Sequence, residues 1–125
     1  MTDKRKAEDV TRVAIMERLC HALQALAAGA DAQAELLPEL ACEADELALE
    51  FDNWLKEALA KYRGEMSAEQ IASLEEVDRL LDEMAGPHRT NLWSEAALRE
   101  DRRWRRARTL AHAALERFGW PAGLP

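Results

Sequence analysis

The chain has 125 residues and a formal net charge of −7, and this length predicts one domain. Ala (24) and Leu (18) dominate while Val, Ile and Thr together number nine, a composition that predicts helices rather than a sheet. Few Gly and Pro, no long apolar run and two Cys exclude collagen-like, disordered, membrane-spanning and disulfide-scaffold classes. We therefore expect one helical domain over residues 1–125, frayed at 1–6 and 121–125, in the reducing cytoplasm of a bacterium.

The first helix is expected over about residues 7–28. Gly29 follows it, and glycine readily takes the left-handed backbone conformation with which many helices end. The expected core face repeats at helical spacing and comprises Ile15, Met16, Leu19, Cys20, Leu23, Leu26 and Ala27. Asp31 then predicts the N-cap of a short helical turn that reaches Leu37.

Two long helices are expected next. Pro38 is tolerated in the first turn of a helix, and from there an apolar stripe runs to Gly64 through Leu40, Ala44, Leu47, Phe51, Trp54, Ala58 and Tyr62. Ser67 and Gln70 predict a capping box at the start of the following helix. That helix is closed by Gly86-Pro87, and its stripe comprises Ile71, Leu74, Val77, Leu81 and Met84.

The remaining helices carry clear end signals. Ser94 predicts the cap of a short helix over residues 95–99, and Asp101 predicts the cap of the last helix. The stripe of the last helix comprises Trp104, Ala107, Ala111, Ala114 and Phe118. Gly119 followed by the apolar Trp120 predicts a Schellman ending, in which Trp120 folds back on the last turn.

Four main helices joined by short links predict the fold class. We expect an all-α protein, specifically an antiparallel four-helix bundle or a close relative with additional short helical turns.

Charge is distributed unevenly along the chain. Between Arg18 and Lys56 there are eight acids and no Lys or Arg, whereas residues 99–108 contain six Arg against two acids. Either these two stretches pair within the molecule, or the acidic helix faces a basic protein partner, whose approach the charge would steer. Leu49 and Cys42 lie among the acids, opposite the apolar stripe of their helix. The predicted partner-binding residues are therefore Glu35, Glu39, Cys42, Glu43, Glu46, Leu49 and Glu50.

Four of the acids also form a spaced pattern, Glu43-x-x-Glu46 and Glu75-x-x-Asp78. This pattern resembles the metal-binding residues of the all-helical nucleotide pyrophosphohydrolases, the MazG-like family. The resemblance covers only these four residues, and it implies that they would hold Mg²⁺ against a nucleoside triphosphate. Helical spacing, in contrast, places Glu46 and Glu75 away from the apolar stripes, on faces exposed to water.

The function expected first is that of a non-catalytic interaction protein with no cofactor, metal or catalytic residue. Its size, acidity and helicity are similar to those of immunity proteins, antitoxins and small regulators. The alternatives are a Mg²⁺-dependent nucleotide pyrophosphohydrolase and a structural homodimer. Nucleic acid is not an expected partner, because the acidic remainder of the chain would repel phosphates.

Overall fold

The computed structural model describes residues 2–36, 45–85 and 90–122. Within these ranges it contains helices and no strand, so the all-α prediction is confirmed there. The elements in chain order are α1 (Thr2–Ala27), α2 (Ala30–Leu36), α3 (Asp45–Tyr62), the 3₁₀-helix η1 (Arg63–Glu65), α4 (Ala68–Met84), the 3₁₀-helix η2 (Thr90–Trp93), α5 (Glu95–Glu100) and α6 (Arg102–Phe118). None of the helices in the described ranges has both the length and the hydropathy needed to cross a bilayer.

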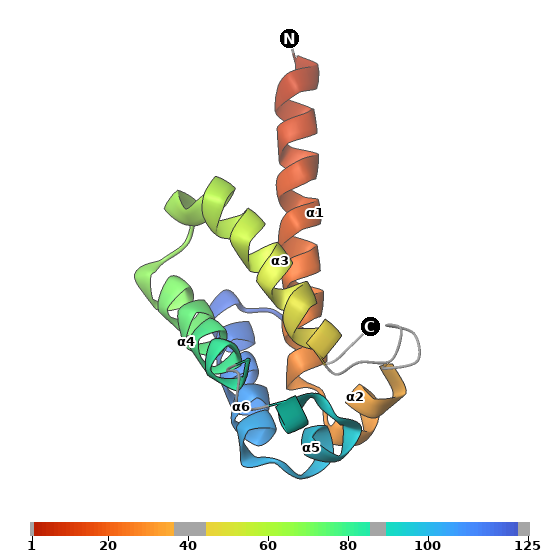
Figure 1. Ribbon diagram of the computed structural model, residues 1–125. Coiled ribbons are helices and arrows are strands. Elements are labelled where there is room, and N and C mark those ends of the chain that lie inside the picture. Colours follow the sequence, from red (N-terminus) through yellow and green to blue (C-terminus); the bar gives the residue numbers. More distant parts are fainter. Residues whose placement is uncertain (1, 37–44, 86–89, 123–125) are drawn as a thin grey trace.

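The four long helices form an antiparallel bundle, as predicted. Figure 1 shows that α1, α3, α4 and α6 run alternately in opposite directions. Helix α1 packs against α3 and α6, and α6 also packs against α4, whereas α3 and α4 make few contacts with each other. The bundle is therefore open along the side between α3 and α4. The short elements α2, η2 and α5 contact one another or α6 at one end of the bundle.

One hydrophobic cluster fills the space between the long helices. Its two largest fully buried side chains, Trp104 and Phe51, come from α6 and α3 and lie on the predicted stripes. The indole N–H of Trp104 donates to the carbonyl of Leu92 at 2.7 Å, so its polar atom is satisfied inside the core. The predicted stripes of α4 and α6 supply further buried residues, namely Leu74, Val77, Leu81, Met84, Ala107, Ala111 and Ala114.

The predicted caps at the starts of α4, α5 and α6 are confirmed. The Ser67 hydroxyl accepts from the backbone N–H of Gln70 at 3.1 Å, and the Gln70 side chain accepts from the N–H of Ser67 at 2.8 Å. Ser94 and Asp101 cap α5 and α6 through their side chains.

The ending of α6 is also as predicted. Gly119 is left-handed (φ 69°), and the N–H of Trp120 donates to the carbonyl of Leu115 at 2.9 Å. The Trp120 ring stacks on Phe118 with centroids 4.3 Å apart, so the residue after the glycine does fold back on the last turn.

Three details differ from the expectations for the first half of the chain. Asp31 is not the N-cap of the short second helix, because α2 begins at Ala30 and Asp31 lies in its first turn. Helix α1 begins at Thr2, earlier than the expected start near residue 7. Among the glycines in the described ranges, only Gly119 has a positive φ. Gly29 therefore does not adopt the left-handed conformation expected for it. Instead α2 follows α1 directly, and the N–H of Gln33 donates to the carbonyl of Gly29 at 2.9 Å.

The stripe expected before Gly64 is only partly in the core. Trp54 is half-buried, because it lies at the edge of the α1/α3 contact rather than inside it. Its indole N–H donates to the Glu50 carboxylate at 3.0 Å, and the guanidinium of Arg18 lies 5.3 Å from its ring centroid. The beginning of this stripe and the expected stop of α4 lie outside the described residues, namely Pro38, Leu40, Ala44, Gly86 and Pro87.

Candidate functional site

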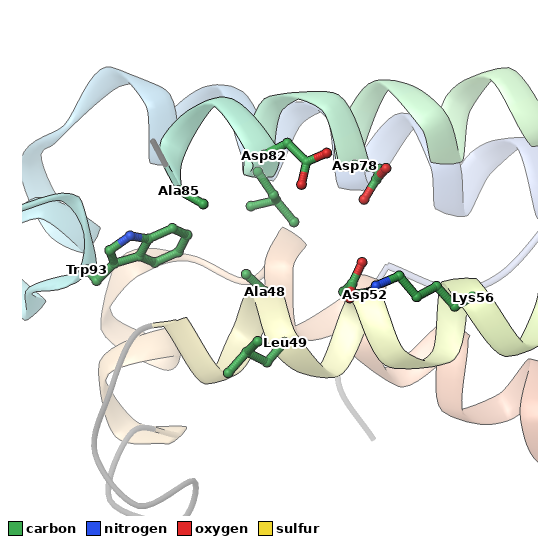
Figure 2. Close-up of a pocket in the computed structure, with 9 residues that line it drawn as sticks. Ala48, Leu49, Asp52, Lys56, Asp78, Asp82, Ala85 and Trp93 are labelled. Atoms are coloured by element: carbon green, nitrogen blue, oxygen red, sulfur yellow. Dashed lines mark ion pairs between the residues drawn. The ribbon is translucent and has the colours of Figure 1, made fainter. Parts of the chain in front are cut away.

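The open side of the bundle contains a groove of about 310 Å³ between α3 and α4, named here the α3/α4 groove. Figure 2 shows its walls, one formed by α3, the other by α4 and its C-cap, with Trp93 of η2 at one end. The lining residues are Ala48, Leu49, Asp52, Lys56, Asp78, Leu81, Asp82, Ala85 and Trp93.

Part of the α3/α4 groove is acidic. In Figure 2, Asp52 on α3 faces Asp78 and Asp82 on α4. The ammonium of Lys56 lies 2.8 Å from the Asp52 carboxylate, and it is the one base among the lining residues. The pKa of Asp78 is raised, first by desolvation, then by the charges of Asp82 and Asp52, while Lys56 acts in the opposite direction. The groove therefore holds negative charge that Lys56 does not fully neutralise.

The other part of the α3/α4 groove is apolar, and the ring of Trp93 bounds it. Trp93 packs edge-on against the buried Trp104, with ring centroids 5.7 Å apart and an interplanar angle of 87°. Leu81 lines this part from α4, and Leu49 lies at its rim with 54% of its surface exposed. A ligand that fits the whole groove would need both apolar and cationic groups.

The structure places the predicted partner-binding residues on two different helices. Leu49 lines the α3/α4 groove, and Glu46 and Glu50 lie near it in sequence on α3. Glu35 is exposed on α2, a helix whose main contacts in the described ranges are with α5. The other three, Glu39, Cys42 and Glu43, lie outside the described residues.

Most of the acidic groove residues belong to no motif that marks them in the sequence. Asp52 with Lys56, and Asp78 with Asp82, are two i,i+4 pairs on the flanks of apolar stripes. Such flanking pairs indicate side chains near a helix–helix boundary. Their meeting in one groove requires α3 and α4 to be neighbours, which the spacing within each helix does not reveal.

The carboxylates of the MazG-like pattern do not form a metal site in the described part of the chain. Asp78 lines the α3/α4 groove, Glu75 is exposed on α4, and Glu46 lies on α3. Glu43 lies outside the described residues. No group of three His, Cys, Asp or Glu side chains in the described ranges lies close enough together to hold a metal ion, so Glu46, Glu75 and Asp78 do not form one.

The arginine-rich stretch, residues 99–108, holds the short helices at the end of the bundle. Arg99 pairs with Asp31 of α2 at 2.5 Å. Arg108 donates to the side chain of Gln33 at 2.9 Å and to the carbonyl of Leu98. The pKa of Arg108 is lowered, mainly by burial of its guanidinium. Among the described side chains, Asp31 is the one acid of the acidic stretch that forms an ion pair with these arginines. Internal pairing of the two stretches is thus limited to this end of the bundle in the described ranges.

Comparisons of the chain with models of known protein families, with curated proteins and with solved structures found no match. The resemblance to nucleotide pyrophosphohydrolases therefore stays limited to the four carboxylates of the sequence pattern. A function for this chain is inferred from its own residues alone.

Proposed function

We propose that this chain is a non-catalytic interaction protein that binds a basic segment of a protein partner in the α3/α4 groove. The observation that carries the proposal is the lining of this groove, which combines three carboxylates and one lysine with an apolar part. A basic amphipathic helix matches this lining, because one face of such a helix presents cationic and apolar side chains together. This is the class of function expected from the sequence, of which immunity proteins and antitoxins are examples.

The charges of the free groove favour a cationic ligand. Lys56 is already paired with Asp52, and no base lies within ion-pair distance of Asp78 or Asp82 among the described side chains. The raised pKa of Asp78 means that its ionisation is disfavoured in the folded protein. A Lys or Arg of the partner beside Asp78 would reduce this penalty, and the net charge of −7 would speed its approach.

The apolar part of the groove would supply affinity rather than steering. Complete burial of a leucine side chain contributes about 1.5–3 kcal/mol, and Leu49 retains 54% of its exposure in the free protein. Covering Leu49 would therefore contribute about 1 kcal/mol to binding. Trp93 is positioned by its contact with Trp104, so little side-chain order would be lost there on binding.

The proposal is tested by isothermal titration calorimetry, in which a synthetic amphipathic helical peptide of Lys and Leu is added to the full chain. The double variant Asp78→Asn/Asp82→Asn should weaken binding about tenfold or more, since 1.4 kcal/mol corresponds to a factor of ten. It should also flatten the salt dependence of association. The matched control is Glu76→Gln/Glu83→Gln, which removes the same charge from exposed positions of the same helix outside the groove.

The control variant should bind nearly as well as the wild type. Equal weakening by the two double variants would contradict the proposal, because net charge alone would then explain the attraction. A partner captured from the source cells should compete with the peptide for the wild-type chain.

A further inference from the structure

The lining of the α3/α4 groove changes in a fixed order from one end to the other. Figure 2 shows Trp93 and Ala85 at one end of the groove. The carboxylates of Asp52 and Asp78 lie further along it, and Lys56 lies beyond them (Figure 2). The groove therefore has an apolar end, an acidic middle and a basic end, and a ligand that fills it needs its own groups in a matching order.

The walls of the groove fix the distance between its apolar end and its acids. On the α4 wall, Ala85 follows Asp78 by seven residues, which is about 10.5 Å along a helix. On the α3 wall, Ala48 precedes Asp52 by four residues, which is about 6 Å. An apolar group between the two alanines therefore lies about 6–10.5 Å from a cation held between the two carboxylates.

Lys56 influences which acids receive the cation of a ligand. Its ammonium is 2.8 Å from the Asp52 carboxylate, whereas no base in the described part of the chain lies within ion-pair distance of Asp78 or Asp82. The Lys56 side chain is 75% exposed, so its pair with Asp52 is a weak one in contact with water. We therefore expect the cation beside Asp78 or Asp82 on the α4 wall, between Lys56 and the apolar end.

The size and the walls of the groove indicate which kind of ligand can supply these two groups. Its volume of about 310 Å³ is at the lower end of ligand-sized cavities, so it has room for a few side chains and not for a whole helix. Both walls are helices, whose backbone N–H and C=O groups bond within the helix and are not free to pair with an extended segment. A helical segment satisfies its own backbone groups, so it can insert side chains from one face and leave its backbone outside the groove.

We propose that the α3/α4 groove accepts two side chains of one partner helix, an apolar one against Trp93 and a cationic one beside Asp78, spaced four or seven positions apart. Residues at these spacings lie on one face of a helix, about 6 and 10.5 Å apart. A spacing of two or five positions places the side chains on different faces, and a spacing of eleven positions, about 16.5 Å, is longer than the distance between the two ends. This inference rests on the proposed function and adds the spacing that the partner must have.

The first test compares two helical peptides of identical composition, built on Ala and Gln. Each carries one Leu and one Lys, seven positions apart in the first peptide and eleven in the second. Both compete with a fluorescently labelled Lys/Leu amphipathic peptide for the full chain, and fluorescence anisotropy measures the displacement. The first peptide should compete at a concentration at least about fivefold lower than the second, which corresponds to about 1 kcal/mol.

Groove variants show whether this difference arises in the α3/α4 groove. In Asp78→Asn/Asp82→Asn the difference between the two peptides should disappear, because the Lys no longer has a carboxylate on the α4 wall. In the matched control Glu76→Gln/Glu83→Gln the difference should persist, since these acids lie outside the groove lining. Persistence of the difference in the first variant would place the cation elsewhere and overturn the inference.

The outcomes of the competition separate this inference from the proposed function. If the labelled peptide does not bind the wild-type chain, the proposed function fails and the inference fails with it. If it binds but the two peptides compete equally, the spacing is wrong and the proposed function stands. Phenethylamine carries an apolar ring and an ammonium in one small molecule. If it displaces the labelled peptide as well as the first peptide does, the groove binds a small amine rather than a helix.

A second test concerns Lys56. The variant Lys56→Gln frees Asp52 to bind the cation, so the first peptide should compete about threefold better, an effect within the range of exposed ion pairs. Lys61→Gln is the matched control, because Lys61 forms the same type of i,i+4 pair with Glu57, 3.1 Å away on the same helix and outside the groove lining.

The control Lys61→Gln should leave the competition nearly unchanged. Equal gains for the two lysine variants would show that net charge alone acts. Weaker competition in Lys56→Gln would show that Lys56 contacts the partner instead of competing with its cation. Either result would overturn the placement of the cation between Lys56 and the apolar end.

Discussion

Replacing Gln33 by Met would show whether one buried amide holds α2 to the end of the bundle. Gln33 is completely buried. Its Nε2 donates to the carbonyls of Leu26 at 2.9 Å and Ala25 at 3.1 Å in the last turn of α1, and its Oε1 accepts from Nε of Arg108 at 2.9 Å. Met has nearly the same length and no hydrogen-bonding nitrogen or oxygen, so Gln33→Met removes these bonds without leaving a large cavity.

The size of the effect follows from the partners that lose a bond. The hydrogen bond from the charged Arg108 contributes about 1.5–3 kcal/mol, and the amide shared by the two α1 carbonyls contributes about 1 kcal/mol. Methionine is easier to bury than an amide, which offsets about 1 kcal/mol of this loss. We therefore expect Gln33→Met to lower the free energy of unfolding by about 1.5–3 kcal/mol.

The measurement is urea unfolding at pH 7, followed by circular dichroism and extrapolated linearly to water. Gln24→Met is the matched control, because Gln24 is also buried on α1 but bonds only through Nε2, to the Pro121 carbonyl at 2.8 Å. Its Oε1 is buried with no hydrogen-bond partner in the described part of the chain. Gln24→Met should therefore cost about 1 kcal/mol or less. Equal losses for the two variants, or almost no loss for Gln33→Met, would refute this role for the Gln33 amide.

Two further predictions concern the core and the α3/α4 groove. Phe51→Ala should lower the free energy of unfolding by about 3–5 kcal/mol, because removal of the fully buried ring would leave a cavity. A loss below about 1 kcal/mol in the same urea assay would contradict the place of Phe51 in the core. For Asp78 the folded pKa is raised above the ordinary value of 3.8, so folding favours the protonated carboxyl, and this contribution is lost as the pH rises through the folded pKa. Asp78→Asn should therefore raise Tm at pH 7 and have little effect below the ordinary pKa of the carboxyl, whereas a gain in Tm confined to low pH would show that the sign is wrong.

Local sequence determined the starts of α4, α5 and α6 and the end of α6, but not the boundary between α1 and α2. The Ser67–Gln70 capping box and the Gly119–Trp120 ending each depend on hydrogen bonds between residues at most five positions apart. The stripe positions of Phe51 and Trp104 depend only on the helical repeat, and both side chains are fully buried. Such features are readable because the atoms that interact are near one another in the chain whatever the tertiary arrangement.

Only the tertiary structure decided what the helix faces meet. Asp52 and Asp78 belong to one groove because α3 and α4 lie side by side yet pack loosely, and helical spacing within either segment is the same with or without that neighbour. In the sequence, Gln33 looks like an ordinary polar residue of a short helix. In the structure it is buried between the end of α1 and Arg108, a residue 75 positions further along the chain. Burial and charge pairing between distant segments depend on which helices become neighbours. The packing of the whole core determines these neighbours, and no single segment does so.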